Sequence, residues 1–364
     1  MVSVTITIER NLGLLEKYQL ACNLLNCYGS IKLPVLLDHL AVEGYPAHFH
    51  LNTFQPALRT LLDAHPNLLV TIRDKKTKHA HFVLLSHADL SKIVLITQPQ
   101  EKKMDQIVQE LVSIQYFDNQ DIETDPLLPL WRLHVVPQST TSCIVSFVVS
   151  HVVADGMSLT VIWKEFLKAL KNDSHTDSSK YIVKINTNQR VPPPYEKSGA
   201  SSVSFIRDVL PKAYTDLLPS VLPTCLARLI NPIRYKSWKG EALAVPGQKH
   251  DSCKRGISAH AVLVAAKFLV WAHLYPQACT KFYTSINTRG FCHPPLSPNR
   301  IGNFIGIHDS IWDTQQLLTQ DIWTIAAMYH QDLQKHKYDG IKETLMIKYL
   351  GSYPKGYYKY PEIK

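Results

Sequence analysis

The chain has 364 residues, of which 45% are hydrophobic and 19% charged, so it can bury the cores of two lobes and is not a disordered or fibrous sequence. Its formal net charge is +9, from 39 Lys and Arg against 30 Asp and Glu, which suits a phosphate-bearing partner. Basic residues do not gather in runs with interleaved aromatics, which disfavours nucleic-acid binding. The seven cysteines are scattered without a CxxC pair, which favours a reducing compartment with free thiols.

The first residues, MVSVTITIERNLG, have no basic flank followed by an apolar core, so they are not a secretory signal. No uninterrupted apolar run in the sequence reaches the length that a transmembrane helix needs. We therefore expect a monomer in the cytoplasm, either soluble or in peripheral contact with a membrane such as the endoplasmic reticulum or a lipid droplet.

The N-terminal part of the chain is predicted to contain two helices and a strand. Apolar residues at helical spacing within residues 10–28 indicate one amphipathic helix. A second helix is expected to begin at Asn52 or Thr53, either of which can cap it. It should end at His65, because the residue before a proline is pushed out of the α region. Alternating apolar residues directly after this stop indicate the strand.

Two histidines raise the question of a metal site. His79 and His81 fall on a predicted strand over residues 79–83, where alternate residues share a face. That spacing could place two imidazoles on one metal ion. No third ligand cluster is evident, so two exposed strand histidines are the favoured interpretation and no metal site is expected.

A buried strand, a sharp turn and a helix are predicted in succession over residues 143–170, after an amphipathic helix near Met104. The strand is apolar and rich in β-branched side chains, which is typical of a strand covered on both faces. Gly156 supplies backbone freedom for the turn, and Ser158 is the expected N-cap of the helix. His151 stands between strand and helix, at a position that holds a side chain rigidly and can open it to a cleft.

The second half of the chain is predicted to contain further helices and strands. Residues 205–232 show apolar helical periodicity broken by prolines; they could lie on a membrane or line a tunnel, but a kinked cover helix is favoured. Ser258 is expected to cap a helix that is apolar nearly all round and therefore buried, with His260 as a structural residue in its first turn. A strand over residues 282–287 and a helix over 322–333 follow.

The spacing His151-x-x-x-Asp155-Gly156 is the HxxxDG pattern, and it resembles the active-site motif of the CoA-dependent acyltransferases. These include the plant BAHD enzymes, chloramphenicol acetyltransferase, peptide-synthetase condensation domains and fungal alcohol acetyltransferases. Other segments are similar to features of this superfamily in the same order along the chain, and the resemblance to fungal alcohol O-acetyltransferases is the closest. These segments are residues 10–18, the string 129–132, Asn287-x-Arg289 and the Gly-Asn-aromatic segment 302–304.

The resemblance implies an α/β, two-lobed fold like that of chloramphenicol acetyltransferase, with mixed sheets and a tunnel between the lobes. The N-terminal lobe would span residues 1–175, a crossover linker 176–200 and the C-terminal lobe 201–364. Acyl-CoA would enter the tunnel from one side and the alcohol from the other.

The same resemblance implies the chemistry. His151 would be the general base that takes a proton from an alcohol hydroxyl, which then attacks the thioester of acetyl-CoA or another acyl-CoA. Asp155 would point away from the substrates and pair with an arginine to hold the loop, with Arg289 as the candidate partner, while Gly156 would leave room at the tunnel. Acetyl-CoA is a co-substrate here, so neither a bound cofactor nor a metal is expected, and the residues that bind CoA are not identified.

Three other classes of protein are weighed against this one. A condensation-type enzyme usually carries a second histidine where this chain has Ser150, and an adjacent carrier domain is not expected here. A nucleotide-binding enzyme is not supported, because the chain has neither a P-loop nor a GxGxxG motif. A catalytically impaired or non-enzymatic binding protein that retains the fold is the remaining alternative.

The C-terminal lobe is expected to be truncated. Members of the resembled family carry further strands after the Gly-Asn-aromatic segment, usually with a DFGWG-like sequence, and this chain shows no such sequence between Asn303 and Lys364. We therefore expect an open sheet edge, and lower solubility or activity than in a longer form of the chain.

Overall fold

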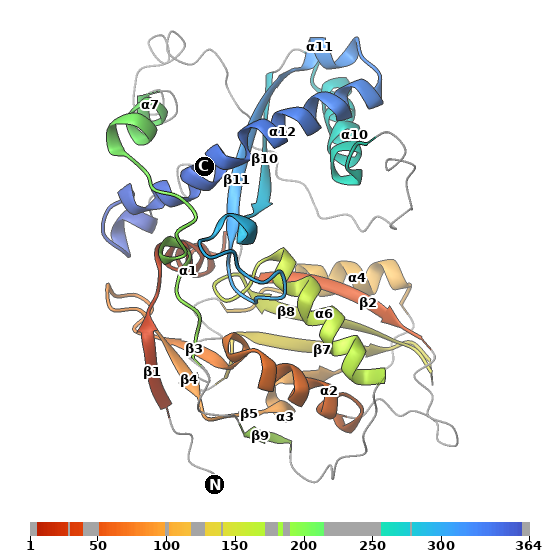
Figure 1. The fold of residues 1–364 in the computed structure, drawn as a ribbon. Coiled ribbons are helices and arrows are strands. Elements are labelled where there is room, and N and C mark those ends of the chain that lie inside the picture. Colours follow the sequence, from red (N-terminus) through yellow and green to blue (C-terminus); the bar gives the residue numbers. More distant parts are fainter. Residues whose placement is uncertain are drawn as a thin grey trace.

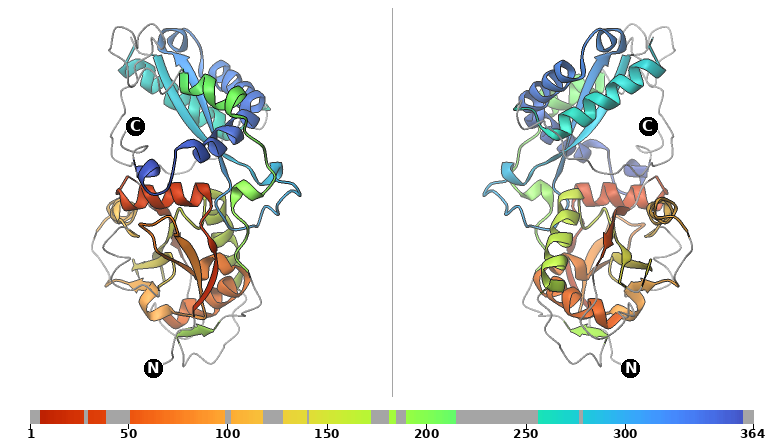
Figure 2. Two further views of the ribbon diagram at one scale, coloured as in Figure 1. Left: turned by 90° about the vertical axis from the view of Figure 1, so that its left-hand side faces the viewer. Right: turned by 90° about the vertical axis from the view of Figure 1, so that its right-hand side faces the viewer.

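The computed structural model has two lobes, which follow one another along the length of the molecule (Figure 1, Figure 2). Helix α1 (Leu14–Leu24) lies on the side of the first lobe that faces the second (Figure 2). The structure describes residues 6–27, 30–38, 51–98, 102–117, 128–139, 141–171, 181–184, 190–214, 256–276 and 279–358.

The centre of the first lobe is a mixed four-stranded sheet. Its strands, in spatial order, are β2 (Ser30–Leu37), β8 (Cys143–Ser150), β7 (Trp131–Pro137) and β6 (Val94–Ile96). β8 is antiparallel to both of its neighbours, and β6 runs parallel to β7. One face is covered by α2 (Leu51–Ala64) and α6 (Gly156–Lys171), and α4 (Met104–Ser113) packs on the other (Figure 1).

Smaller sheets and helices complete the first lobe. One antiparallel sheet contains β1 (Ile6–Asn11), β4 (His81–Leu85) and β3 (Val70–Arg73), the last following a 3-10 turn at Pro66–Leu69. β5 (His87–Asp89) leads through α3 (Leu90–Ile93) into β6, and it pairs with β9 (Ile182–Lys184). Part of the predicted linker is therefore a strand of the first lobe.

An aromatic cluster joins α6 and α2 to the central sheet. Phe147 of β8 meets Trp163 and Phe166 of α6 edge to face, with ring centroids 5.1 Å apart in each pair. Phe54 of α2 stacks on Phe166 at 6.2 Å. These rings are buried because α2 and α6 cover the face of β8 that carries Phe147, and burial of such surface stabilises by about 25 cal/mol per Å².

The second lobe is built on an antiparallel pair, β10 (Cys279–Asn287) and β11 (Ile305–Asp313). Three helices pack with it, namely α10 (Ala259–Leu274), α11 (Thr314–Leu318) and α12 (Ile322–Leu345). Phe268 of α10 lies at the centre of this core, with its ring 4.1 Å from Phe282 and 5.1 Å from Trp312. The part of the chain that connects the first lobe to the second forms the turn Tyr195–Lys197, a π-helical turn at Phe205–Val209 and the short α7 (Leu210–Lys212).

Several local predictions need correction. Asn52 and Thr53 lie inside α2, which already includes Leu51, so neither residue is its N-cap. Ser258 caps α10 as predicted, since its side chain accepts from the amide of Ala261. That helix is not buried all round, however: Leu263, Val270 and Leu274 are 59%, 60% and 65% exposed, because α10 packs through one stripe only.

Two elements of the second lobe differ from the prediction: strand β11 was not predicted, and helix α12 is longer than predicted. β11 carries His308 and Ser310 on its buried side, and these polar residues hide the alternating pattern of a strand. α12 runs on to Leu345, well past the apolar stripe that indicates it. The predicted kinked helix over residues 205–232 lies mostly outside the described residues, and the expectation of missing strands in the second lobe stays a prediction.

The last described residues return to the first lobe. After the 3-10 turn Met346–Tyr349, Tyr353 and Tyr357 are 6% and 2% exposed and belong to the same hydrophobic core as β8 and α6. The Tyr353 hydroxyl donates a hydrogen bond to the backbone carbonyl of Lys75. The sequence of this C-terminal tail shows neither helical nor strand periodicity. Its contact with the first lobe is made by the two buried rings of Tyr353 and Tyr357.

We expect Tyr357→Ala to lower the free energy of unfolding by about 3 kcal/mol, because it empties a buried aromatic site. Equilibrium denaturation in urea measures the change. Tyr349→Ala, which removes a ring that is 39% exposed, is the matched control and should cost much less. Equal costs for the two substitutions would show that the tail does not pack on the first lobe.

Candidate active site

The turn that carries His151 is held at both ends by regular structure. All eight residues of β8 are buried, because β2 and β7 flank the strand and helices cover its faces. His151 follows the last residue of this strand, and α6 begins at Gly156. Backbone hydrogen bonds close the turn, from the amide of Val153 to the carbonyl of Ser150 at 3.1 Å and from Leu159 to Asp155 at 3.0 Å.

Asp155 caps helix α6, a role that the sequence analysis gave to Ser158. The Asp155 carboxylate accepts a hydrogen bond from the amide of Ser158 at 2.8 Å, which satisfies an unpaired donor of the first turn. The prediction of Ser158 as the N-cap is therefore wrong by three residues, because Ser158 already lies inside the helix.

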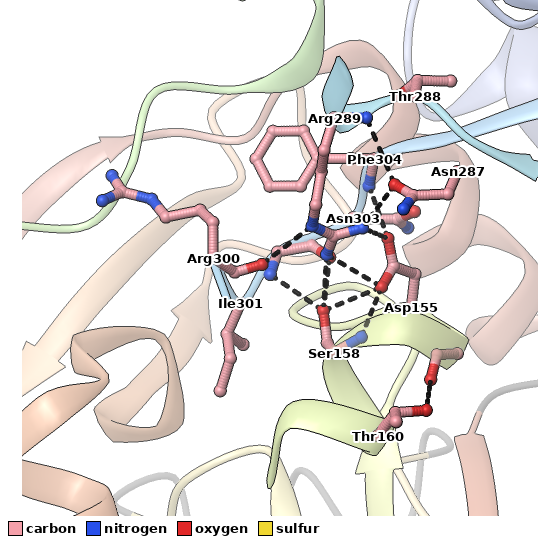
Figure 3. A network of polar contacts seen from close by, with 12 residues as sticks. Asp155, Ser158, Thr160, Asn287, Thr288, Arg289, Arg300, Ile301, Asn303 and Phe304 are labelled. Carbon is pink, nitrogen blue, oxygen red and sulfur yellow. Dashed lines mark hydrogen bonds and ion pairs between the residues drawn. The ribbon is translucent and has the colours of Figure 1, made fainter. Parts of the chain in front are cut away.

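A buried ion pair joins Asp155 to Arg289, which lies just after β10 in the second lobe (Figure 3). The guanidinium donates to both carboxylate oxygens, from Nη1 at 2.8 Å and from Nη2 at 3.0 Å. Each side chain is only 2% exposed. Arg289 Nε also donates to the carbonyl of Arg300 at 2.9 Å, and the amide of Phe304 donates to Asp155 at 3.0 Å, so both charges are fully hydrogen-bonded.

Ser158 is the third member of this network (Figure 3). Its hydroxyl accepts from Arg289 Nη2 at 2.9 Å and from the amide of Gly302 at 3.1 Å. The same oxygen lies 2.8 Å from Asp155 Oδ1 and 2.8 Å from the carbonyl of Gly302, and its one proton can serve either acceptor. We call Asp155, Ser158, Arg289 and residues 302–304 the interlobe clamp.

Sequence reasoning missed the roles of Ser158 and Asn303 in this clamp. Both lie within segments that the sequence patterns single out, but no spacing rule says which distant backbone groups they meet. Asn303 donates from Nδ2 to the backbone carbonyl of His151 at 2.7 Å, and the same nitrogen is 3.5 Å from His151 Nδ1. The second lobe thus contacts both the acid and the histidine of the turn.

The environment of His151 favours its neutral form. Burial is the largest influence and lowers the pKa of the imidazole below its ordinary value. Hydrogen bonds to the backbone of His151 itself and of Ala154, together with the negative charge of Asp155, act in the opposite direction without overcoming burial. A neutral imidazole near physiological pH can accept a proton, which is what a general base must do.

Gly156 stands beside open space. A Cβ at this position would meet no atom within 4 Å, and its backbone is not in the left-handed region. Backbone freedom for the turn is therefore not the reason for a glycine here, and that part of the sequence analysis is wrong. The absence of a side chain leaves free volume next to the turn that carries His151.

The other histidines singled out in the sequence lie elsewhere. His81 Nδ1 is 2.9 Å from the carbonyl of His79, and His260 Nε2 is 3.2 Å from the hydroxyl of Tyr329. Within the described residues, no group of three or more His, Cys, Asp or Glu side chains is placed to hold a metal ion. In that same part of the chain, no helix has both the length and the apolar character needed to cross a membrane.

A hollow of about 600 Å³ lies between β11 and α12, and the sequence analysis did not anticipate it. Asp332 contacts His308 at 2.9 Å and His336 at 2.8 Å there. None of the predicted site residues lines this hollow.

Two α/β lobes, with a buried clamp behind the histidine at the end of a strand, fit the fold that the HxxxDG resemblance to the CoA-dependent acyltransferases implies. The family model for alcohol acetyltransferases matches residues 11–254, and the chain belongs to this family. A search of curated proteins finds no match.

Solved structures share the fold at low sequence identity. TRI3 trichothecene 15-O-acetyltransferase from Fusarium sporotrichioides is 12% identical, with 97% of this chain and 78% of that chain covered at a TM-score of 0.61. TRI101 of the same organism, solved with coenzyme A and T-2, is 12% identical, with 96% and 79% covered at 0.53. The epimerization domain from the third module of tyrocidine synthetase B is 12% identical, with 93% and 76% covered at 0.53. The predicted two-lobed α/β fold of this superfamily is confirmed.

We expect Asp155→Ala and Arg289→Ala each to lower the free energy of unfolding by about 3–5 kcal/mol, because each leaves a buried partner without its counter-charge. The double variant should lose less than the sum of the two, since the two side chains act as a unit. Equilibrium denaturation of all four proteins measures the coupling.

The control for this cycle is Glu110→Ala, which breaks the exposed Lys102–Glu110 pair and should change stability by less than about 1 kcal/mol. Strictly additive effects at Asp155 and Arg289 would contradict the pairing seen in the structure.

Proposed function

We propose that this chain transfers an acetyl group from acetyl-CoA to the hydroxyl group of an alcohol, with His151 as the general base. The observation that carries the proposal is the turn itself: a histidine with a lowered pKa follows a buried strand, the interlobe clamp holds the turn, and Gly156 at its end faces open space. Membership of the alcohol acetyltransferase family supports the reaction class, and the crystallised complex of TRI101 with coenzyme A supports the donor.

The reaction needs one base and no covalent intermediate on the protein. His151 accepts the proton of the alcohol as its oxygen forms a bond to the thioester carbonyl carbon. The tetrahedral intermediate then collapses, the carbon–sulfur bond breaks, and the imidazolium returns the proton to the leaving thiolate of CoA. Holding two substrates at one base supplies much of the rate, because it replaces a bimolecular encounter with a fixed geometry.

The remaining predicted residues have supporting roles in this proposal. The Asp155–Arg289 pair points its charges into the clamp, so that it holds the turn and takes no proton from substrate. Gly156 keeps space free for the substrates, since any side chain would occupy the open volume beside it. The alternative, a binding protein that keeps the fold without the chemistry, predicts acetyl-CoA binding without turnover.

Release of CoA from acetyl-CoA, followed with a thiol reagent over a panel of alcohols, tests the function. We expect His151→Ala to lower kcat by about 10²–10⁴-fold with little loss of thermal stability, because the side chain acts as a base and is not part of the core. His79→Ala, at an exposed histidine, is the control and should keep full activity. Wild-type activity in the His151 variant would contradict the assignment of the base.

The pH dependence follows from the direction of the pKa shift. The base must be neutral, so kcat/KM should fall as the pH drops through the pKa of His151 in the free enzyme. Because burial lowers that pKa, the acid limb of the profile should lie below 6.5, the ordinary value for histidine. A pH–rate profile between pH 4 and 9 measures it, and an acid limb at or above 6.5 would be incompatible with this environment.

A further inference from the structure

The hollow between β11 and α12 takes no part in the reaction above. Its volume of about 600 Å³ falls within the range of about 300–1,000 Å³ that small-molecule sites occupy. The strand and the helix that wall it lie side by side in the second lobe (Figure 1). No residue of the interlobe clamp lines the hollow, so it is distinct from the candidate active site.

The strand wall carries two buried polar groups without partners. His308, Ser310 and Trp312 are alternate residues of β11, so their side chains lie on one side of the strand, and His308 reaches Asp332 of α12 from that side. All three residues line the hollow, and Ser310 and Trp312 are only 7% and 9% exposed. Within the described residues, neither the Ser310 hydroxyl nor the Trp312 indole nitrogen has a hydrogen-bond partner. Because a buried polar group without a partner is unfavourable, a ligand that supplies one gains affinity.

These groups define part of what a ligand must offer. The indole N–H of Trp312 can only donate, so it needs an acceptor, whereas the Ser310 hydroxyl can donate or accept. A hydroxyl group on the ligand meets either need. Ile311 and Met328 also line the hollow, so an apolar ligand body can lie against them.

The hollow is also acidic. Its lining in the described chain contains no lysine or arginine but four carboxylates, namely those of Asp309, Asp332, Asp339 and Glu343. Two of these have lysine partners from neighbouring segments: Lys281 Nζ is 2.7 Å from Asp309, and Lys212 pairs with Glu343. The remaining two carboxylates, both on α12, favour a cationic ligand.

Asp332 is the carboxylate best placed to receive a cation. It lies between His308 and His336, at 2.9 and 2.8 Å from their ring nitrogens, and the two rings are parallel within 5°. A carboxylate has about four lone-pair sites, so the two imidazoles leave others open, and the side chain is 31% exposed. Within the described residues, no cluster of three or more side chains is placed to hold a metal ion, which favours an organic cation.

We propose that the hollow binds a small organic amine with an apolar body and a hydroxyl group. The ammonium group pairs with Asp332, the hydroxyl group meets Ser310 or Trp312, and the apolar body lies against Ile311 and Met328. Binding at this site requires no acyl transfer, so it can be measured whatever the role of His151.

Isothermal titration calorimetry at low ionic strength tests the site with tyramine, which joins an ammonium group to a phenol through an apolar body. Tyrosol has a hydroxyl group in place of the ammonium group and should bind about 10-fold more weakly, because a hydrogen bond to a charged group is lost. Phenethylamine lacks the phenol oxygen and should bind about 5-fold more weakly than tyramine. Equal affinity for all three compounds, or no binding of tyramine at millimolar concentration, would overturn the proposal.

Two variants locate the site. Asp332→Asn should weaken tyramine binding about 10-fold and leave tyrosol binding unchanged, because only the ammonium group needs the negative charge. Ser310→Ala should weaken the binding of both compounds while the melting temperature stays the same or rises, because the variant removes a buried hydroxyl without a partner. Glu110→Gln, at an exposed acid of the first lobe, is the control and should bind both compounds as the wild type does.

Wild-type affinity for tyramine in both Asp332→Asn and Ser310→Ala would place the binding elsewhere and contradict the proposal, as would displacement of tyramine by acetyl-CoA. His151→Ala should bind tyramine as the wild type does. A wild-type protein that binds tyramine in the hollow but acetylates no alcohol refutes only the proposed function. An active enzyme without tyramine binding refutes only this site.

Discussion

The buried ion pair between Asp155 and Arg289 is the interaction on which the arrangement of the site depends. Two charges that are 2% exposed are stable only if every lone pair and proton is satisfied, and here groups on five residues from two lobes do so, namely Ser158, Asn287, Arg300, Gly302 and Phe304. This requirement makes the pair selective: it forms only when the turn after β8 and the segment after β10 meet in one geometry. The ion pair therefore specifies the docking of the lobes more than it stabilises either one.

Each lobe supplies different parts of the site around the ion pair. The first lobe supplies the rigid strand that ends at His151 and the helix that Asp155 caps. The second lobe supplies Arg289 and Asn303, which hold the acid and the histidine from the opposite side. A second link runs through the connecting segment, where Glu196 accepts from the amide of Leu14 at the start of α1 and the carbonyl of Ser198 accepts from the amide of His293. His151 thus lies where the two lobes meet, and at least two independent sets of contacts hold them together.

Local sequence patterns predicted the elements well wherever burial follows one face. The strand of β8, the helix stop at His65 and the Ser258 cap of α10 are all set by residues within a few positions of one another. Prediction failed where a polar residue is buried by a distant partner, as with His308 of β11 beside Asp332. The predicted burial was also wrong where apolar residues face outward, as on α10. Hydropathy alone does not say which face of a helix packs against another element.

The sequence by itself determined the strand-turn-helix that holds His151 and Asp155, because its apolar pattern is a local feature, whereas the roles of base and acid came from the resemblance of HxxxDG to a family motif. It also indicated Arg289 as the partner, but only by resemblance to a family, since no local rule links residues 134 positions apart. The tertiary structure alone decided that Ser158 bridges to Gly302, that Asn303 meets His151 and that Tyr357 returns to the first lobe. The reason is physical: each of these contacts satisfies a buried polar or aromatic group with an atom far away in the chain, and that pairing exists only once the two lobes are packed together.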